Sequence, residues 1–91
     1  MANYDEFLVD SVTSGADNIS ANSGKTYTIT VAKTGYTALG FLGIDHNGDT
    51  KLLVGKHSLF TSAYVSVYNM GSSQQSSIKI TVTILYRKNK T

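Results

Sequence analysis

The sequence predicts a small all-β protein, an antiparallel β-sandwich of six to eight short strands that can be wound in a jelly-roll-like manner. Two segments, residues 25–33 (KTYTITVAK) and 77–86 (SIKITVTILY), alternate apolar with hydroxyl or charged side chains. Successive side chains of a strand point to opposite faces, so each segment has one buried and one solvated face. No convincing helical period or internal repeat interrupts this pattern, and residues 1–91 are expected to form a single domain.

Clusters of Gly, Ser, Asn and Asp separate the apolar runs and are expected to be turns. The first predicted strand carries three consecutive apolar residues, Phe7, Leu8 and Val9. This indicates a strand covered on both faces, or one that lies at a subunit contact. We expect extended segments, in chain order, at residues 4–13, 18–21, 25–33, 36–45, 51–54, 63–70 and 77–87.

The fourth of these segments is expected to be a central or interface strand. It contains Gly40 and Gly43, and glycine inside a strand often marks a bulge, so we expect a bend at one of the two. A period of two places Leu39 and Phe41 on one face of this strand and Leu42 and Ile44 on the other.

Asn47 and Gly48 lie between two apolar runs and are the strongest short hairpin signal in the chain. The type I′ turn that they favour requires positive φ at both central positions, which Asn and Gly tolerate best. The returning strand is expected to end in a polar loop at residues 55–58, after which Leu59 and Phe60 re-enter the core.

The surface is expected to be neutral and rich in hydroxyl groups. Charged residues make up 15% of the chain, against roughly 25% in ordinary soluble domains, whereas Ser and Thr number 11 each and Tyr 6. Such a surface suits sugars or other subunits better than polyanions. The net charge of +2 owes much to Arg87, Lys88 and Lys90, which we interpret as a solubilising end, so no nucleic acid is expected as a partner.

No apolar run reaches the length of a membrane span, and the N-terminal residues lack the features of a signal peptide, so we expect no membrane insertion. The chain has no cysteine and therefore no disulfide. A core of this size is marginal on its own, and oligomerisation is a common remedy. We therefore expect a homo-oligomer.

Asp45, Asn47 and Asp49 occupy the first, third and fifth positions of a calcium-loop pattern. The sixth and twelfth positions lack the Gly and the bidentate Glu that such a loop requires, so a plain hairpin turn is the preferred interpretation. Asp45, His46, Asn47 and Asp49 at the tip of this turn remain candidates for contact with a ligand.

His46 and His57 could approach each other if this region folds back, but two histidines alone make a weak metal site. Three copies of one histidine around a trimer axis are the alternative that the sequence leaves open. We expect surface histidines, with no metal and no cofactor.

The predicted strand 63–70 places Tyr64, Ser66 and Tyr68 on one face. Tyrosine rings can stack on sugar rings, and their hydroxyl groups add hydrogen bonds. The alternative is packing in a subunit interface or against a loop. Tyr36 is a further ligand-binding candidate with the same alternative.

No arrangement of residues points to catalysis, and we expect no enzyme. The chain contains no nucleophile elbow of the G-x-S-x-G type, and Glu6 is its only glutamate. A glycosidase pair would require aspartates from turns and from the N-terminal region to converge.

A subunit interface is expected where strands are apolar on both faces. The candidates are Phe7 and Leu8 in the first predicted strand and Leu39 and Phe41 in the fourth.

Residues 19–40, ISANSGKTYTITVAKTGYTALG, resemble the small β-domains at the C-termini of bacteriophage tail-fibre and receptor-binding proteins of gut Firmicutes phages and prophages. Those domains carry a similar ANS…T…V.K.GYT.LG string and end in a strand similar to residues 80–89, ITVTILYRKN. The resemblance covers residues 19–89 except the middle, 43–62, which we expect to be a variable region of this protein. Such loops commonly carry recognition.

The resemblance implies a virion appendage module, made in the host cytoplasm, often homotrimeric, that contacts other virion proteins and host-surface glycans. It implies no particular site residues. The alternatives are a structural virion protein, such as a capsid decoration or head-fibre protein, and a stand-alone carbohydrate-binding module. Glycan binding would separate the first alternative from the appendage, and a monomer with an exposed aromatic platform is expected of the second.

Overall fold

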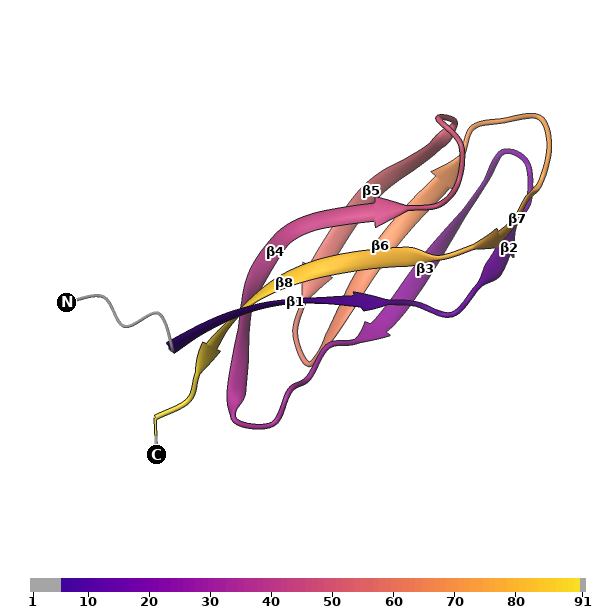
Figure 1. The fold of residues 1–91 in the computed structure, drawn as a ribbon. Coiled ribbons are helices and arrows are strands. Elements are labelled where there is room, and N and C mark those ends of the chain that lie inside the picture. The colour runs from indigo at the N-terminus through magenta and orange to yellow at the C-terminus, as the bar shows by residue number, and fades with distance from the viewer. Residues whose placement is uncertain (1–5, 91) are drawn as a thin grey trace.

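The computed structural model describes residues 6–90, and this part of the chain is built from strands without an α-helix (Figure 1). All strand pairs are antiparallel, which confirms the predicted all-β class and a small β-sandwich. Residues 4 and 5, the start of the first predicted strand, lie outside the described residues. The strands are β1 (Phe7–Thr13), β2 (Asp17–Ile19), β3 (Ser23–Thr30), β4 (Tyr36–His46), β5 (Leu52–Leu59), β6 (Ser62–Asn69), β7 (Gln75–Ile78) and β8 (Ile80–Lys88).

Two three-stranded sheets form the layers of the sandwich, with strand orders β1-β8-β4 and β3-β6-β5. A short β2-β7 ladder lies at one end of the elongated molecule, which measures 53 × 21 × 19 Å (Figure 1). The pairs β1·β8, β2·β7 and β3·β6 are nested along the chain, as in a jelly roll. β4 and β5 do not pair with each other, because β4 joins β8 and β5 joins β6.

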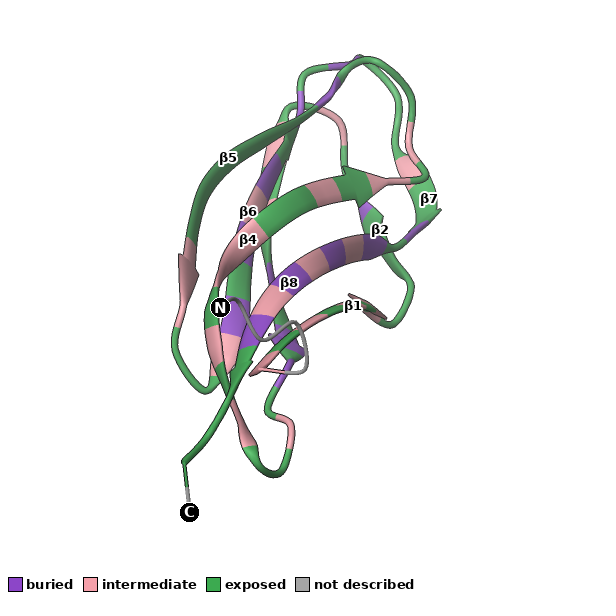
Figure 2. Cartoon of the chain, turned by 60° about the vertical axis from the view of Figure 1, so that its left-hand side comes forward, coloured by how far each residue is buried: buried purple, intermediate pink, exposed green. Residues whose placement is uncertain are grey.

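The core lies between the two sheets and is formed mainly by β3, β6 and β8. Figure 2 shows buried and intermediate residues alternating along β8, as the period of two predicted. Each large aliphatic side chain removed from water contributes about 1.5–3 kcal/mol. The buried apolar residues are Ile19, Tyr27, Ile29, Val31, Leu52, Ala63, Val65, Val67, Ile78, Ile80, Val82, Ile84 and Tyr86.

Both alternating segments are shorter as strands than predicted. β3 ends at Thr30, yet Val31 stays buried, and its carbonyl accepts a hydrogen bond of 2.6 Å from the Tyr86 hydroxyl. The C-terminal segment is divided into β7 and β8 at Lys79, shortly after Ser77, which adopts a positive φ of 55°. The side chains keep their alternation while the backbone ladder changes partner.

β4 does not keep a period of two, so the predicted face assignment of its apolar residues is wrong. Leu39 and Phe41 were expected on one face. Leu39 is half exposed on the outside, whereas Phe41 packs against the core together with Ile44. Leu42 is likewise exposed. β4 is also an edge strand of its sheet and not a central one.

Two β-bulges cause this difference. The register of β4 against β8 shifts between Ala38 and Gly40 and again between Phe41 and Gly43. A bulge adds one residue to a strand and resets its alternation, so apolar side chains of β4 reach the core at every third residue here. The bend expected at Gly40 or Gly43 is thus a bulge at each of them.

The predicted hairpin at Asn47 and Gly48 is also wrong. β4 and β5 belong to different sheets, so this turn crosses from one layer to the other, and neither residue has a positive φ. The Asn47 amide instead bridges the break between β7 and β8: it donates to the Ser77 carbonyl (3.1 Å) and accepts from the Lys79 N–H (2.8 Å). The side chain is used to connect segments distant in sequence, which a local turn signal does not reveal.

Residues 55–58 belong to β5 and are not a loop. A register shift between Val54 and His57 accommodates them in the ladder with β6. Leu59 packs against the core as expected, but Phe60 is 77% exposed at the β5–β6 turn, contrary to the prediction.

Candidate ligand-binding face

The outer face of the β3-β6-β5 sheet carries Tyr64 and Tyr68, for which the sequence left ligand stacking and packing as alternatives. Ala63, Val65 and Val67 of β6 point into the core, so Tyr64 and Tyr68 point outward, where they are 37% and 45% exposed. β6 is the central strand of its sheet, so both rings have neighbours on either side.

Tyr68 is held in place by β3 and by the turn before it. Its hydroxyl donates a 2.9 Å hydrogen bond to the carbonyl of Asn22, a residue with a positive φ of 51°. Tyr68 is also the register partner of Gly24, where an added Cβ would lie 3.3 Å from the Tyr68 ring carbon Cδ2. The absence of a side chain at Gly24 therefore lets the ring lie close to the sheet, and the ring is preorganised.

A groove of about 640 Å³ runs beside Tyr68. Its apolar wall is formed by Leu53 and Val54 of β5, which are 47% and 37% exposed. Its hydroxyl groups come from Thr26 and Ser66, whose oxygens lie 3.0 Å apart in a mutual hydrogen bond. The remaining lining residues are Gly24, Lys25, Gly55 and Val67.

The groove carries little net charge. Its one lining cation, Lys25, lies 2.6 Å from the Asp17 carboxylate. This hydrogen bond, together with the Asn18 N–H, holds the pKa of Asp17 below its ordinary value of 3.8. An aromatic ring, aliphatic side chains and neutral hydroxyl groups suit a neutral amphipathic ligand.

Tyr64 lies on the same face but does not line the groove. It is opposite Thr28 of β3 and Ser58 of β5. Tyr64 and Tyr68 are four positions apart on β6, so the two residues lie about 13 Å apart along the strand. The two rings cannot enclose one sugar unit, and would contact separate units of a longer ligand.

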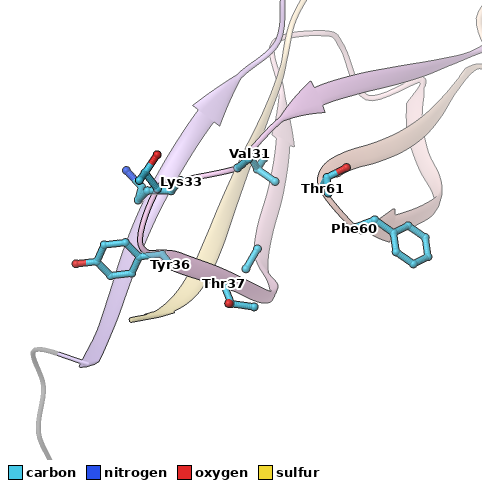
Figure 3. Close-up of a pocket in the computed structure, with 9 residues that line it drawn as sticks. Val31, Lys33, Tyr36, Thr37, Phe60 and Thr61 are labelled. Carbon is cyan, nitrogen blue, oxygen red and sulfur yellow. The ribbon is translucent and has the colours of Figure 1, made fainter. Parts of the chain in front are cut away.

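Tyr36 lies elsewhere, in a hollow of about 380 Å³ at the end of the sandwich between the β3–β4 connection and the β5–β6 turn (Figure 3). Its ring and that of Phe60 point away from each other (Figure 3). Tyr36 packs edge-on against Tyr86 at a centroid distance of 6.4 Å. The structure therefore does not bring Tyr36 together with Tyr64 and Tyr68.

This end of the sandwich is tied by an ion pair. The Lys33 ammonium lies 2.9 Å from the Asp10 carboxylate and 5.7 Å from the centre of the Tyr86 ring. The hydrogen bond from Lys33, followed by that from the Ser11 N–H, lowers the pKa of Asp10. The same pair raises the pKa of Lys33, and burial raises the pKa of Tyr86. The charged groups of Asp10 and Lys33 and the hydroxyl of Tyr86 are therefore engaged in contacts within the fold.

The candidate residues of the β4–β5 turn bind mainly to the protein itself. Asp45 accepts from the His46 N–H (2.8 Å), and the His46 Nδ1 accepts from the Gly48 N–H (3.1 Å). Asp49 accepts from the Lys51 N–H (2.8 Å) and from a side-chain amide of β7 (2.9 Å). Within residues 6–90, no three His, Asp or Glu side chains approach closely enough to hold a metal ion.

The four predicted interface residues divide into two kinds. Phe7 and Leu39 are 48% and 50% exposed, on the outer face of the β1-β8-β4 sheet. Leu8 and Phe41 pack against the core of their own chain, and the Phe41 ring meets His57 edge-on at 5.2 Å. Only the first two are thus available to another subunit.

Sequence reasoning missed Gly24, Leu53 and the polar anchor Asn69. Gly24 and Leu53 belong to the groove only because β3 and β5 flank β6 on either side, a pairing that the sequence did not indicate. Asn69 interrupts the apolar alternation of β6 at an inward position, and this was the signal available for it.

Comparisons of this chain with protein-family models, with curated proteins and with solved structures gave no significant match. The part of the chain that the structure describes, residues 6–90, has no helix long and apolar enough to cross a membrane.

Proposed function

We propose that this protein is a bacteriophage virion appendage module, a tail-fibre head or receptor-binding domain, that attaches to neutral glycans of the host surface. The virion assignment rests on the resemblance of residues 19–40 to such domains. The glycan assignment rests on the groove beside Tyr68. Its role is binding and not catalysis.

In this proposal, the Tyr68 ring stacks on the apolar face of a sugar unit. The hydrogen bond to the Asn22 carbonyl and the close approach over Gly24 fix the ring before binding, which limits the conformational entropy lost. Thr26 and Ser66 exchange their mutual hydrogen bond for bonds to sugar hydroxyl groups. Leu53 excludes water from the opposite side.

A single open groove of this kind binds weakly, so attachment depends on several copies acting together. Linked copies raise avidity without any new contact in the individual groove. A homo-oligomer in the virion, next to other virion proteins, supplies this multivalency.

A structural virion protein, such as a capsid decoration protein, is the second candidate. The observation that favours it is the exposed apolar surface of the other sheet, which includes Phe7 and Leu39. Such a protein requires contacts with coat subunits and no glycan.

The decisive experiment is binding of the intact chain to an array of defined neutral oligosaccharides, followed by two-dimensional NMR titration with any that bind. We expect amide shifts at Thr26, Ser66 and Tyr68. Tyr68→Ala should reduce affinity at least tenfold, and Tyr68→Phe should give a smaller loss, because the stacking ring remains while the hydrogen bond that fixes it is removed. Phe60→Ala removes an exposed ring far from the groove and is the matched control.

Two results would contradict the proposal. Shifts confined to the hollow around Tyr36 and Phe60 would move the site to the end of the sandwich. Absence of binding to any glycan on the array would favour the structural virion protein.

A further inference from the structure

The outer face of the β1-β8-β4 sheet carries exposed apolar side chains. No segment within residues 6–90 covers them. Phe7 and Val9 of β1 are 48% and 56% exposed, and Leu39 and Leu42 of β4 are 50% and 57% exposed. Leu85 of β8 lies between the two strands, in register with Val9. We call these five residues the apolar outer face.

The relief of this face alternates between projections and hollows. In β4, each exposed leucine is followed by a glycine: Leu39 by Gly40, and Leu42 by Gly43. A Cβ added at either glycine would meet no atom within 4 Å, so both positions open to free space. A surface with protruding leucines beside empty positions can accept the same surface from another molecule.

Charged side chains of opposite sign lie at the two ends of this ladder. Arg87 lies at one end of the outward side of β8, and Asp45 of β4 is in register with Thr81 at the other. Thr81 and Arg87 are six positions apart, a span of about 20 Å along the strand. Lys79 directly precedes β8 and lies at the same end of the sheet as Asp45.

We infer that the apolar outer face binds the same face of a second copy of this chain in a two-fold pair. The two β8 strands run antiparallel across the interface, so that Arg87 of each copy lies beside Thr81 and Asp45 of the partner subunit. A two-fold interface requires one patch to complement itself, and this face supplies both apolar relief and both signs of charge.

This arrangement is independent of glycan binding but compatible with it. The groove beside Tyr68 lies on the outer face of the other sheet, so pairing through β1, β8 and β4 leaves both grooves open. The two grooves would point away from each other. The family resemblance favours a trimer, and mass in solution separates the two assemblies.

Light scattering on a sizing column, with the intact chain over a range of concentrations, tests the pair. We expect twice the chain mass of 9.8 kDa. The double variant Leu39→Asp, Leu42→Asp should be a monomer at every concentration. Leu53→Asp, which places the same charge on the outer face of the other sheet, should remain a pair and is the matched control.

Charge reversal provides a test that leaves the apolar residues intact. Arg87→Glu or Asp45→Lys alone should raise the dissociation constant of the pair roughly tenfold or more, because like charges then meet across the interface. The two reversals combined should restore most of the affinity. Circular dichroism of each variant checks that the fold is retained.

The inference is overturned by a monomer or a trimer of the unaltered chain at all concentrations, or by a pair that survives Leu39→Asp, Leu42→Asp. A monomer would assign the face to a different protein. A pair in which the combined charge reversal rescues nothing would contradict the proposed antiparallel arrangement.

Discussion

Asn69 is the residue on which the loops at one end of the sandwich depend. It is fully buried at an inward position of β6. Its Nδ2 group donates to the carbonyls of Ile19 (3.1 Å), Ser20 (3.3 Å) and Ser73 (2.9 Å). Its Oδ1 atom accepts from the Gly71 N–H (2.9 Å) and from the Gln75 side chain (3.2 Å). A single amide thus joins the β2–β3 turn to the β6–β7 loop.

We expect Asn69→Ala to lower the free energy of unfolding by about 3 kcal/mol, because it leaves several buried backbone groups without partners. The matched control is Asn18→Ala, which removes one exposed hydrogen bond to the Ser77 N–H (3.0 Å) and should cost about 1 kcal/mol. Urea denaturation at one fixed protein concentration measures both. Equal losses for the two variants would show that Asn69 is not the anchor described here.

At the scale of elements, the junction between β7 and β8 is completed by a side chain from another part of the chain. Lys79 lies outside both strands, and its N–H donates to the Asn47 Oδ1 atom instead of to a neighbouring strand. The Asn47 side chain therefore replaces a neighbouring strand as the hydrogen-bond partner at this junction. This allows the chain to pass from the β2-β7 pair into the β1-β8-β4 sheet.

Hydrogen exchange of the Lys79 amide should report this role. We expect Asn47→Ala to speed exchange at Lys79 markedly while the amide of Ile84 in the core keeps its protection. Asn47→Asp keeps an acceptor oxygen for Lys79 but loses the donor to the Ser77 carbonyl, so it should preserve most of the protection. Unchanged exchange at Lys79 in Asn47→Ala would mean that the bond does not limit opening of this junction.

At the scale of the whole molecule, two ion pairs link the N-terminal strands β1 and β2 to β3 and to the connection between β3 and β4. Asp17 of β2 pairs with Lys25, and Asp10 of β1 pairs with Lys33. Both carboxylates have a lowered pKa, chiefly because of the lysine hydrogen bond. At the alkaline end, burial raises the pKa of the core tyrosines Tyr27 and Tyr86 above 10.0.

The free energy of unfolding should therefore be highest between these limits. A lowered carboxyl pKa stabilises the fold above the ordinary value of 3.8, and this stabilisation is lost as pH falls through the folded pKa. A raised tyrosine pKa stabilises the fold below 10.0, and this stabilisation is lost as pH rises further.

Denaturation across the pH range at constant protein concentration measures the loss of stability at low pH (the acid limb) and at high pH (the alkaline limb). Asp10→Asn combined with Asp17→Asn should flatten the acid limb. On the alkaline side it should remove the contribution of Lys33, whose pKa the Asp10 pair raises, and leave the effect of burial on the two tyrosines in place. High salt should reduce the acid slope of the unaltered chain, because the pairs are exposed and screened. An acid limb that the double variant does not alter would assign it to other carboxylates.

Much of the core and of the candidate face was predictable. The alternation in residues 25–33 and 77–86 identified Tyr27, Ile84 and Tyr86 as inward residues, and that in 63–70 placed Tyr64 and Tyr68 outside. These predictions succeeded because side-chain alternation follows from the geometry of a single strand.

The predictions that failed depended on partners that are distant in sequence. Asn47 and Gly48 have the local chemistry of a hairpin, but hydrogen bonds to residues 77 and 79 and the separate sheets of β4 and β5 place them at a crossing between layers. Leu39 and Leu42, expected on opposite faces of β4, lie on the same outer face because bulges opposite β8 reset the alternation.

By itself, the sequence determined the all-β class, the main inward residues and the hydroxyl-rich surface, because each of these follows from the side-chain period and composition. Only the tertiary structure decided which strands are neighbours, and with them the groove between Tyr68 and Leu53, the Asn69 anchor and the apolar outer face. Strand pairing is set by contacts between residues far apart in the chain and by the requirement that buried polar groups find partners. A local sequence pattern reveals neither of these.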